Sequence, residues 1–189
     1  KLSYRSMRIV VFSPDIPYPP NRGGRADVWR RILGFRKLGH EVMLVNLFEP
    51  TGPEAPTADH LMTIDAHINA RFSFPHRRSV TKTIRQIACA WRTPWHAANR
   101  IPSALEFVEL VSTIRSFSPN LLWLEGPWFG VTVRRIAREL GCGYAYRSHN
   151  VEHIYIWNQA KVAGSLRDSL AWRLACIGLK RFEQRLLVD

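Results

Sequence analysis

The sequence has no long apolar run and few cysteines. None of its 189 residues belongs to a stretch of about 18 apolar residues, so we expect no transmembrane helix. Near the start there is only the short apolar run from Ile9 to Phe12, without a small-residue cleavage site, which predicts a buried strand and no signal peptide. Cys89, Cys142 and Cys176 lack the spacing of disulfide frameworks and of metal sites, and they predict reduced thiols in a cytoplasmic protein.

Acidic residues are also scarce. The chain has 15 Asp and Glu against 27 Lys and Arg, which gives a formal net charge of +12. Such a charge favours anionic partners, which include nucleic acid, acidic lipid and phosphorylated ligands, without choosing among them. The hydrophobic share of 46% and the charged share of 22% are close to globular averages, so a wholly disordered chain is excluded.

Two common phosphate-binding motifs are missing. Neither the G-x-G-x-x-G fingerprint of dinucleotide-binding domains nor the G-x-x-x-x-G-K-[ST] P-loop occurs, which disfavours the common NAD enzymes and ATPases. No cluster of histidines, cysteines or paired carboxylates has the spacing of metal ligands, so no metal cofactor is expected.

Short apolar runs alternate with helical patterns along the chain. The run Arg8–Ser13 predicts a strand, and a proline-rich loop then leads to a helix that ends at Gly39. Further strands are expected over 40–48, 121–124 and 144–148, with another somewhere within 61–74, and further helices over 79–91, 103–118, 131–140 and 165–187. This alternation predicts one three-layer α/β domain with a mostly parallel, Rossmann-like sheet.

Gly23, Gly24 and Arg25 stand at the expected start of the first helix. Glycines let a ligand approach the backbone, and a helix N-terminus presents unpaired amide groups and the positive end of the helix dipole. Arg25 and Arg22 would add charge-assisted contacts to a phosphate or carboxylate. The pattern predicts a phosphate-binding or substrate-binding site, with an ordinary turn as the alternative.

Four more candidates follow the carboxyl ends of predicted strands, where doubly wound sheets bind their ligands. Glu125 and Asn150 are candidates to bind substrate, and Trp128 is a candidate to stack on a sugar or a base. His149 is the candidate catalytic residue, because a histidine at this edge can act as an acid or a base. A structural role in the turns is the alternative for each of them.

The stretch from Arg71 to Arg100 mixes basic and aromatic side chains. Within it, the residues that we expect to face a membrane are Arg77, Arg78, Lys82, Arg85, Trp91 and Trp95. A short amphipathic helix of this composition suits the surface of an anionic bilayer. The same composition suits single-stranded nucleic acid, and a solvated basic face over an ordinary core helix is the third interpretation.

The order of these motifs resembles a known family. The segment Met7–Val42 contains a strand, a proline-rich loop, Gly-Gly, a helix and Gly-His-Glu-Val, as in glycosyltransferase family 4 enzymes of the GT-B fold. The later stretches LLWLEGPWFG and YRSHNVEH are also similar to the N-terminal domain of that family. The resemblance covers the chain from Met7 to Asp189, so residues 1–189 would form the N-terminal, acceptor-side half of a GT-B fold.

The resemblance implies retaining, metal-independent transfer of a sugar from a nucleotide-sugar to an acceptor. Gly23 and Gly24 would lie near the donor phosphates, and His149 would contact the transferred sugar or the acceptor. Many relatives glycosylate lipid-linked or polysaccharide acceptors, so a cytoplasmic protein, peripheral at the inner membrane face, is expected, and nucleic acid becomes an unlikely partner.

One part of the family pattern has no counterpart here. The C-terminal donor domain, with its glutamate-rich motif, does not follow, so we expect little or no transferase activity from the 189-residue chain alone. The alternatives are a non-catalytic subunit that recruits a separate donor-binding chain to a membrane, and an anion-binding α/β module.

Overall fold

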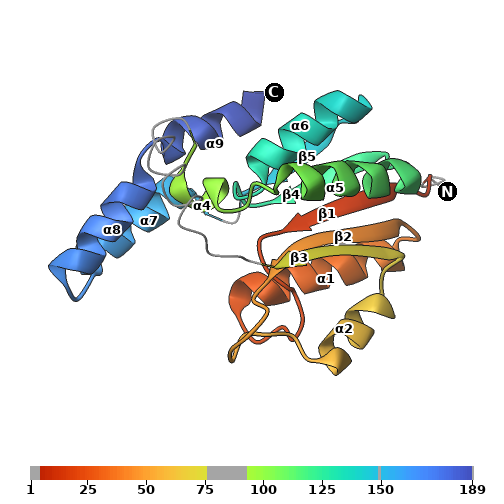
Figure 1. Cartoon of the computed structure of the whole chain (residues 1–189), viewed down its shortest axis with the longest axis horizontal. Coiled ribbons are helices and arrows are strands. Elements are labelled where there is room, and N and C mark those ends of the chain that lie inside the picture. The colour runs from red at the N-terminus through yellow and green to blue at the C-terminus, as the bar shows by residue number, and fades with distance from the viewer. Residues whose placement is uncertain (1–4, 76–92, 149, 189) are drawn as a thin grey trace.

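A computed structural model describes residues 5–75, 93–148 and 150–188, which form a parallel β-sheet with helices on both faces (Figure 1). The strands are β1 (Arg8–Ser13), β2 (Glu41–Phe48), β3 (Ala70–Pro75), β4 (Leu121–Glu125) and β5 (Tyr144–Arg147). Their order is β3-β2-β1-β4-β5, and every neighbouring pair is parallel. The expected three-layer α/β, Rossmann-like fold is therefore confirmed.

The central strands are buried on both faces, as continuous apolar runs predict. Successive side chains of β1 point to opposite faces, so Val10 and Phe12 pack in one core and Ile9 and Val11 in the other. The first core is covered by helices that include α5 (Ala104–Phe117) and α6 (Gly130–Leu140), and the second by α1 (Gly23–Lys37) and α2 (Ala58–Asp65).

Of the remaining described helices, one precedes α5 in the chain and three come after β5. They are α4 (Trp95–Ala98), α7 (Glu152–Val162), α8 (Leu166–Cys176) and α9 (Leu179–Val188). In Figure 1, α7 and α8 extend away from the sheet as an antiparallel pair. None of the helices in the described ranges combines the length and apolar character needed to cross a bilayer.

Short sequence signals mark the ends of several helices. The helix expected over 103–118 begins as α5, because Ser103 and Glu106 form a capping box at its start, with the Ser103 amide donating to Glu106 Oε2 at 2.8 Å. Gly39 and Gly141 follow the ends of α1 and α6 with φ angles of 82° and 61°, the left-handed conformation that favours glycine.

One element prediction was confirmed in part and another was wrong. A third strand was expected within 61–74, and β3 begins there at Ala70, but the first residues of the range belong to α2, which begins because Thr57 caps it and which buries Ile64 against the sheet. A single helix was expected over 165–187, but α8 ends at Cys176 and α9 begins at Leu179, because Gly178 takes a φ of 73°. The expected helix over 79–91 lies outside the described residues.

The strand order determines where a ligand can bind. From β1 the chain passes to β2 and β3 on one side, and later to β4 and β5 on the other. The connections that leave the carboxyl ends of β1 and β4 therefore diverge, and a crevice opens between them.

Candidate functional site

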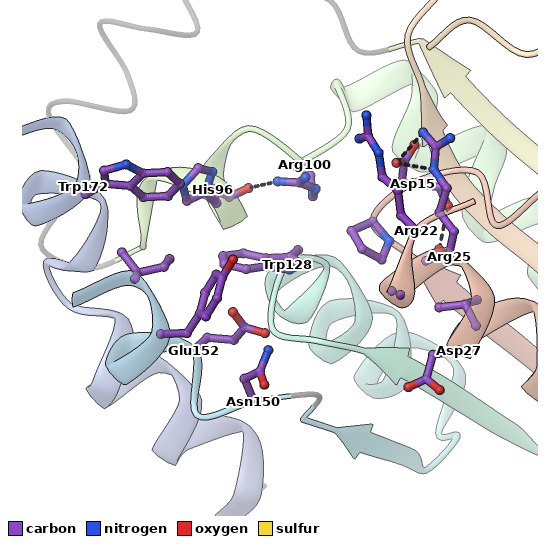
Figure 2. A pocket seen from close by; sticks show the side chains of 17 residues that line it. Asp15, Arg22, Arg25, Asp27, His96, Arg100, Trp128, Asn150, Glu152 and Trp172 are labelled. Carbon is purple, nitrogen blue, oxygen red and sulfur yellow. Dashed lines mark hydrogen bonds and ion pairs between the residues drawn. The ribbon is translucent and has the colours of Figure 1, made fainter. Parts of the chain in front are cut away.

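A pocket of about 650 Å³ lies at this carboxyl edge of the sheet (Figure 2). Five residues that the sequence singled out line it, from α1 and from the connections after β4 and β5: Gly23, Gly24, Arg25, Trp128 and Asn150. The structure thus brings the start of α1 next to two segments that follow it by more than a hundred residues in the sequence.

The start of α1 is open to the pocket. Arg22, the N-cap residue, makes no side-chain capping hydrogen bond, and the first turn contains no acidic residue. A Cβ atom placed on Gly23 or Gly24 would meet nothing within 4 Å. The first amide groups of the helix therefore face space that an anion can enter.

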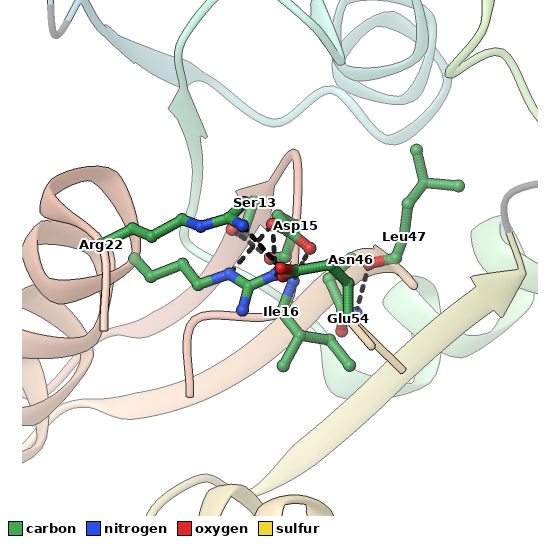
Figure 3. Close-up of polar contacts among 8 residues, drawn as sticks. Ser13, Asp15, Ile16, Arg22, Asn46, Leu47 and Glu54 are labelled. Atoms are coloured by element: carbon green, nitrogen blue, oxygen red, sulfur yellow. Dashed lines mark hydrogen bonds and ion pairs between the residues drawn. The ribbon is translucent and has the colours of Figure 1, made fainter. Parts of the chain in front are cut away.

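Arg25, on the pocket lining, links α1 to two loops through hydrogen bonds to carboxylates. Its Nε and Nη2 atoms donate to Asp15 Oδ2 at 3.0 and 2.8 Å, and Nη2 also donates to Glu54 Oε2 at 2.9 Å. Figure 3 shows Arg22 reaching the same Glu54 carboxylate, while Asp15 Oδ1 accepts from the amide of Ile16. The guanidinium expected to contact a ligand is thus engaged by two carboxylates, which fix the loop after β1 against α1.

Glu125 lies behind the pocket and is not part of its lining. Its carboxylate is fully buried and accepts hydrogen bonds from Arg31 Nε at 2.7 Å, Trp123 Nε1 at 2.9 Å and Arg147 Nη1 at 3.2 Å. Arg147 also pairs with Asp27 at 2.8 Å. The structure therefore places this candidate in a buried charge network that joins α1 to β4 and β5, and not in contact with a ligand.

An aromatic wall forms the other side of the pocket. Trp128 meets the ring of His96 edge-on, with the ring centroids 5.3 Å apart, and the centroid of Trp172 is 6.4 Å from His96. Arg100 Cζ lies 5.6 Å from the Trp128 ring, and its Nη1 donates to the His96 carbonyl at 2.9 Å. Figure 2 shows these side chains side by side.

Sequence analysis missed most of this wall. His96, Tyr155 and Trp172 carry no local signal, because α4, α7 and α8 bring them to the pocket only in the folded chain. Arg100 was noted only as the end of a basic stretch. Only the packing of these helices against the sheet shows that these residues line the pocket.

Burial controls the charges on this wall. Burial, helped by the positive charge of Arg100, lowers the pKa of His96 to about 4. Burial also lowers the pKa of Arg100 to about 10, although the carboxylate of Asp15 opposes the shift. At neutral pH, His96 is therefore uncharged and Arg100 is protonated.

Of the remaining candidates, only Trp95 is among the described residues. Trp95 begins α4 and is not among the residues that line this pocket. The catalytic candidate His149 and the membrane candidates Arg77, Arg78, Lys82, Arg85 and Trp91 lie outside the described residues. Within the described ranges, no group of three or more His, Cys, Asp or Glu side chains could hold a metal ion.

Comparisons with known proteins give a similarity among solved structures and none elsewhere. No family model matches the sequence, and no curated protein is similar to it. Among solved structures, the chain is similar to Glycyrrhiza uralensis UGT73P12 complexed with glycyrrhetinic acid 3-O-monoglucuronide, with 11% identity and a TM-score of 0.43. The match covers 84% of this chain but only 31% of that one, so the chain spans about a third of its length.

Proposed function

We propose that this chain is the acceptor-side N-terminal domain of a glycosyltransferase of the GT-B type, similar to family 4. The observation that carries the proposal is the pocket at the carboxyl edge, where the open helix start at Gly23 and Gly24 faces an aromatic wall that includes Trp128. Amide donors suit the phosphates of a nucleotide-sugar, and an indole suits the apolar face of a sugar ring.

Different residues would bind different parts of the substrates. In this proposal the amides of Gly23 and Gly24 bind donor phosphate, Trp128 packs on a sugar ring, and Asn150 binds a hydroxyl group. His149, the residue before Asn150, contacts the transferred sugar, as the family resemblance implies. The transfer proceeds with retention and without a metal ion, and it needs a donor-binding domain beyond these 189 residues.

A substitution at Gly24 tests the helix start. In Gly24→Val, the new side chain would occupy the space in front of the first amides, so we expect binding of inorganic pyrophosphate to weaken at least about tenfold. Isothermal titration calorimetry measures this. Since no atom lies within 4 Å of the added Cβ and valine has a better helix propensity than glycine, the melting temperature should not fall.

Gly34→Val is the matched control. Gly34 lies in the same helix, its Cβ would also meet nothing within 4 Å, and it does not line the pocket. This variant should bind pyrophosphate as the parent chain does. Equal affinities in the parent chain and Gly24→Val would remove the helix start from the proposal.

A specific surface favours a second candidate, a subunit that recruits its partner to the cytoplasmic face of an anionic membrane. On α8, Leu166, Leu170 and Leu174 repeat at four-residue spacing and are 92%, 59% and 53% exposed. Trp157 of α7 is also exposed, and Arg173 Cζ lies 5.6 Å from its ring. An exposed leucine stripe beside tryptophan and arginine matches the composition of interfacial helices.

Vesicle flotation tests this candidate. We expect the chain to float with vesicles of phosphatidylcholine and phosphatidylglycerol, and the Leu170→Glu/Leu174→Glu double variant to lose most of that binding. The control is Leu105→Glu/Val108→Glu, which changes two exposed residues of α5, 84% and 67% exposed, and should still float. Equal flotation of both double variants would exclude α8 as the membrane contact.

A further inference from the structure

Arg100 stands where two hollows of the surface meet. It lines the pocket of about 650 Å³ and also a second one of about 270 Å³, which lies over the loop after β1. In Figure 2, Arg100 lies between the aromatic wall and the group formed by Asp15, Arg22 and Arg25. A ligand that extends from one hollow into the other would pass this guanidinium.

The hydrogen-bonding capacity of Arg100 is only partly used. Its Nη1 donates to the His96 carbonyl at 2.9 Å, and one face of the guanidinium lies over the Trp128 ring. Its Nε is enclosed and makes no hydrogen bond to any residue that the structure describes. Arginine has five N–H donors, so most of them remain available to an anion.

The charge of Arg100 is not matched by a carboxylate in contact. In the described part of the chain, its nitrogens form no ion pair, although Asp15 acts on it from a distance. Two of the carboxylates that line the larger pocket have partners of their own: Asp15 pairs with Arg25 at 2.8 Å, and Asp27 pairs with Arg147 at 2.8 Å. A positive charge that is largely removed from water and has no contacting counter-ion gains strongly when an anion arrives.

The aromatic neighbours define the rest of the ligand. Trp128 and Trp172 flank His96, which is uncharged at neutral pH because its pKa is lowered to about 4. This part of the pocket therefore offers ring faces and no second cation. It suits the apolar face of a sugar or another flat ring.

We propose that the acceptor taken by this pocket is acidic: a ring that packs on Trp128 and Trp172, with a carboxylate or phosphate that Arg100 binds. This inference rests on the proposed function, because it names the substrate class of the same pocket. Arginine forms paired, charge-assisted hydrogen bonds with both kinds of anion, so the two anions are separate arms of the test.

The test compares three probes that share an aryl group and a sugar ring. They are 4-nitrophenyl β-D-galactoside, its 6-phosphate and 4-nitrophenyl β-D-galacturonide, titrated into the 189-residue chain by calorimetry. We expect at least one anionic probe to bind about tenfold or more tightly than the neutral galactoside. The tighter of the two anionic probes identifies phosphate or carboxylate as the group that Arg100 binds.

Variants assign the preference to Arg100. Arg100→Gln should bind all three probes alike, and Arg100→Lys should recover part of the preference, because it keeps the charge but not the paired geometry. The matched control is Arg173→Gln, since Arg173 also lies 5.6 Å from an indole ring but on α8, outside the pocket. That control should keep the full preference.

Each outcome has a meaning. Equal binding of the neutral and anionic probes to the parent chain would overturn this inference and leave the proposed sugar site standing. Binding of none of the three would overturn both. If Arg100→Gln fails to fold, the comparison of probes on the parent chain and on Arg173→Gln still decides whether the pocket prefers an acidic ligand.

Discussion

Replacing Glu125 with alanine should lower the free energy of unfolding by about 3–5 kcal/mol. Glu125 is fully buried and accepts hydrogen bonds from Arg31, Trp123 and Arg147. Its removal would leave two guanidiniums, whose side chains are only 23% and 29% exposed, without this shared carboxylate. Breaking a buried pair from one side is costly because the remaining charge stays out of water.

Urea denaturation followed by circular dichroism measures this loss. The control is Glu139→Ala, because Glu139 is 41% exposed and lies 3.7 Å from Arg115, so its removal should cost no more than about 1 kcal/mol. A similar small loss in Glu125→Ala would mean that the network beneath the pocket does not hold β4 and β5 to α1.

The second large effect is on pH dependence. The pKa of His96 is lowered to about 4 from 6.5, first by burial and then by the charge of Arg100. The unfolded chain therefore binds more protons than the folded chain between these two pH values. The free energy of unfolding should fall as the pH falls from about 6.5 to about 4, by about 3 kcal/mol from His96 alone.

Comparison with His96→Asn isolates this contribution. Unfolding is measured in urea at several pH values from 7 to 4, and the difference between the parent chain and the variant is followed, since the carboxylates titrate in both. The variant should lose about 3 kcal/mol less over this range. Identical slopes in the parent chain and His96→Asn would show that His96 is not buried as described.

The fold could be predicted because its signals are local. The apolar runs of β1 and β4, the capping box at Ser103 and the glycine at 141 each act within a few residues. The helix α7 was missed because only a few of its residues, such as Ile156 and Ala160, are buried apolar positions, while several exposed ones are also apolar. An apolar pattern on both faces hides the helical period.

The candidate site could be predicted only in part. Parallel strands bring their carboxyl ends together, so Gly23, Gly24, Trp128 and Asn150 could be expected at one edge of the sheet. Glu125 was expected there too, yet the side chain of the last residue of a strand can point inward. Its two cationic partners, Arg31 and Arg147, are 94 and 22 residues from it in the sequence. Such distant pairings leave no trace in the local sequence.

The pairing of Arg22 and Arg25 with Asp15 and Glu54 also bears on how fast a ligand arrives and how long it stays. These carboxylates neutralise the charges beside the helix start, whereas the net charge of +12 is spread over the whole molecule. Long-range attraction speeds encounter and is screened by salt, while short contacts inside a pocket govern release. Added salt should therefore slow the association of anions with this chain much more than it changes their residence time.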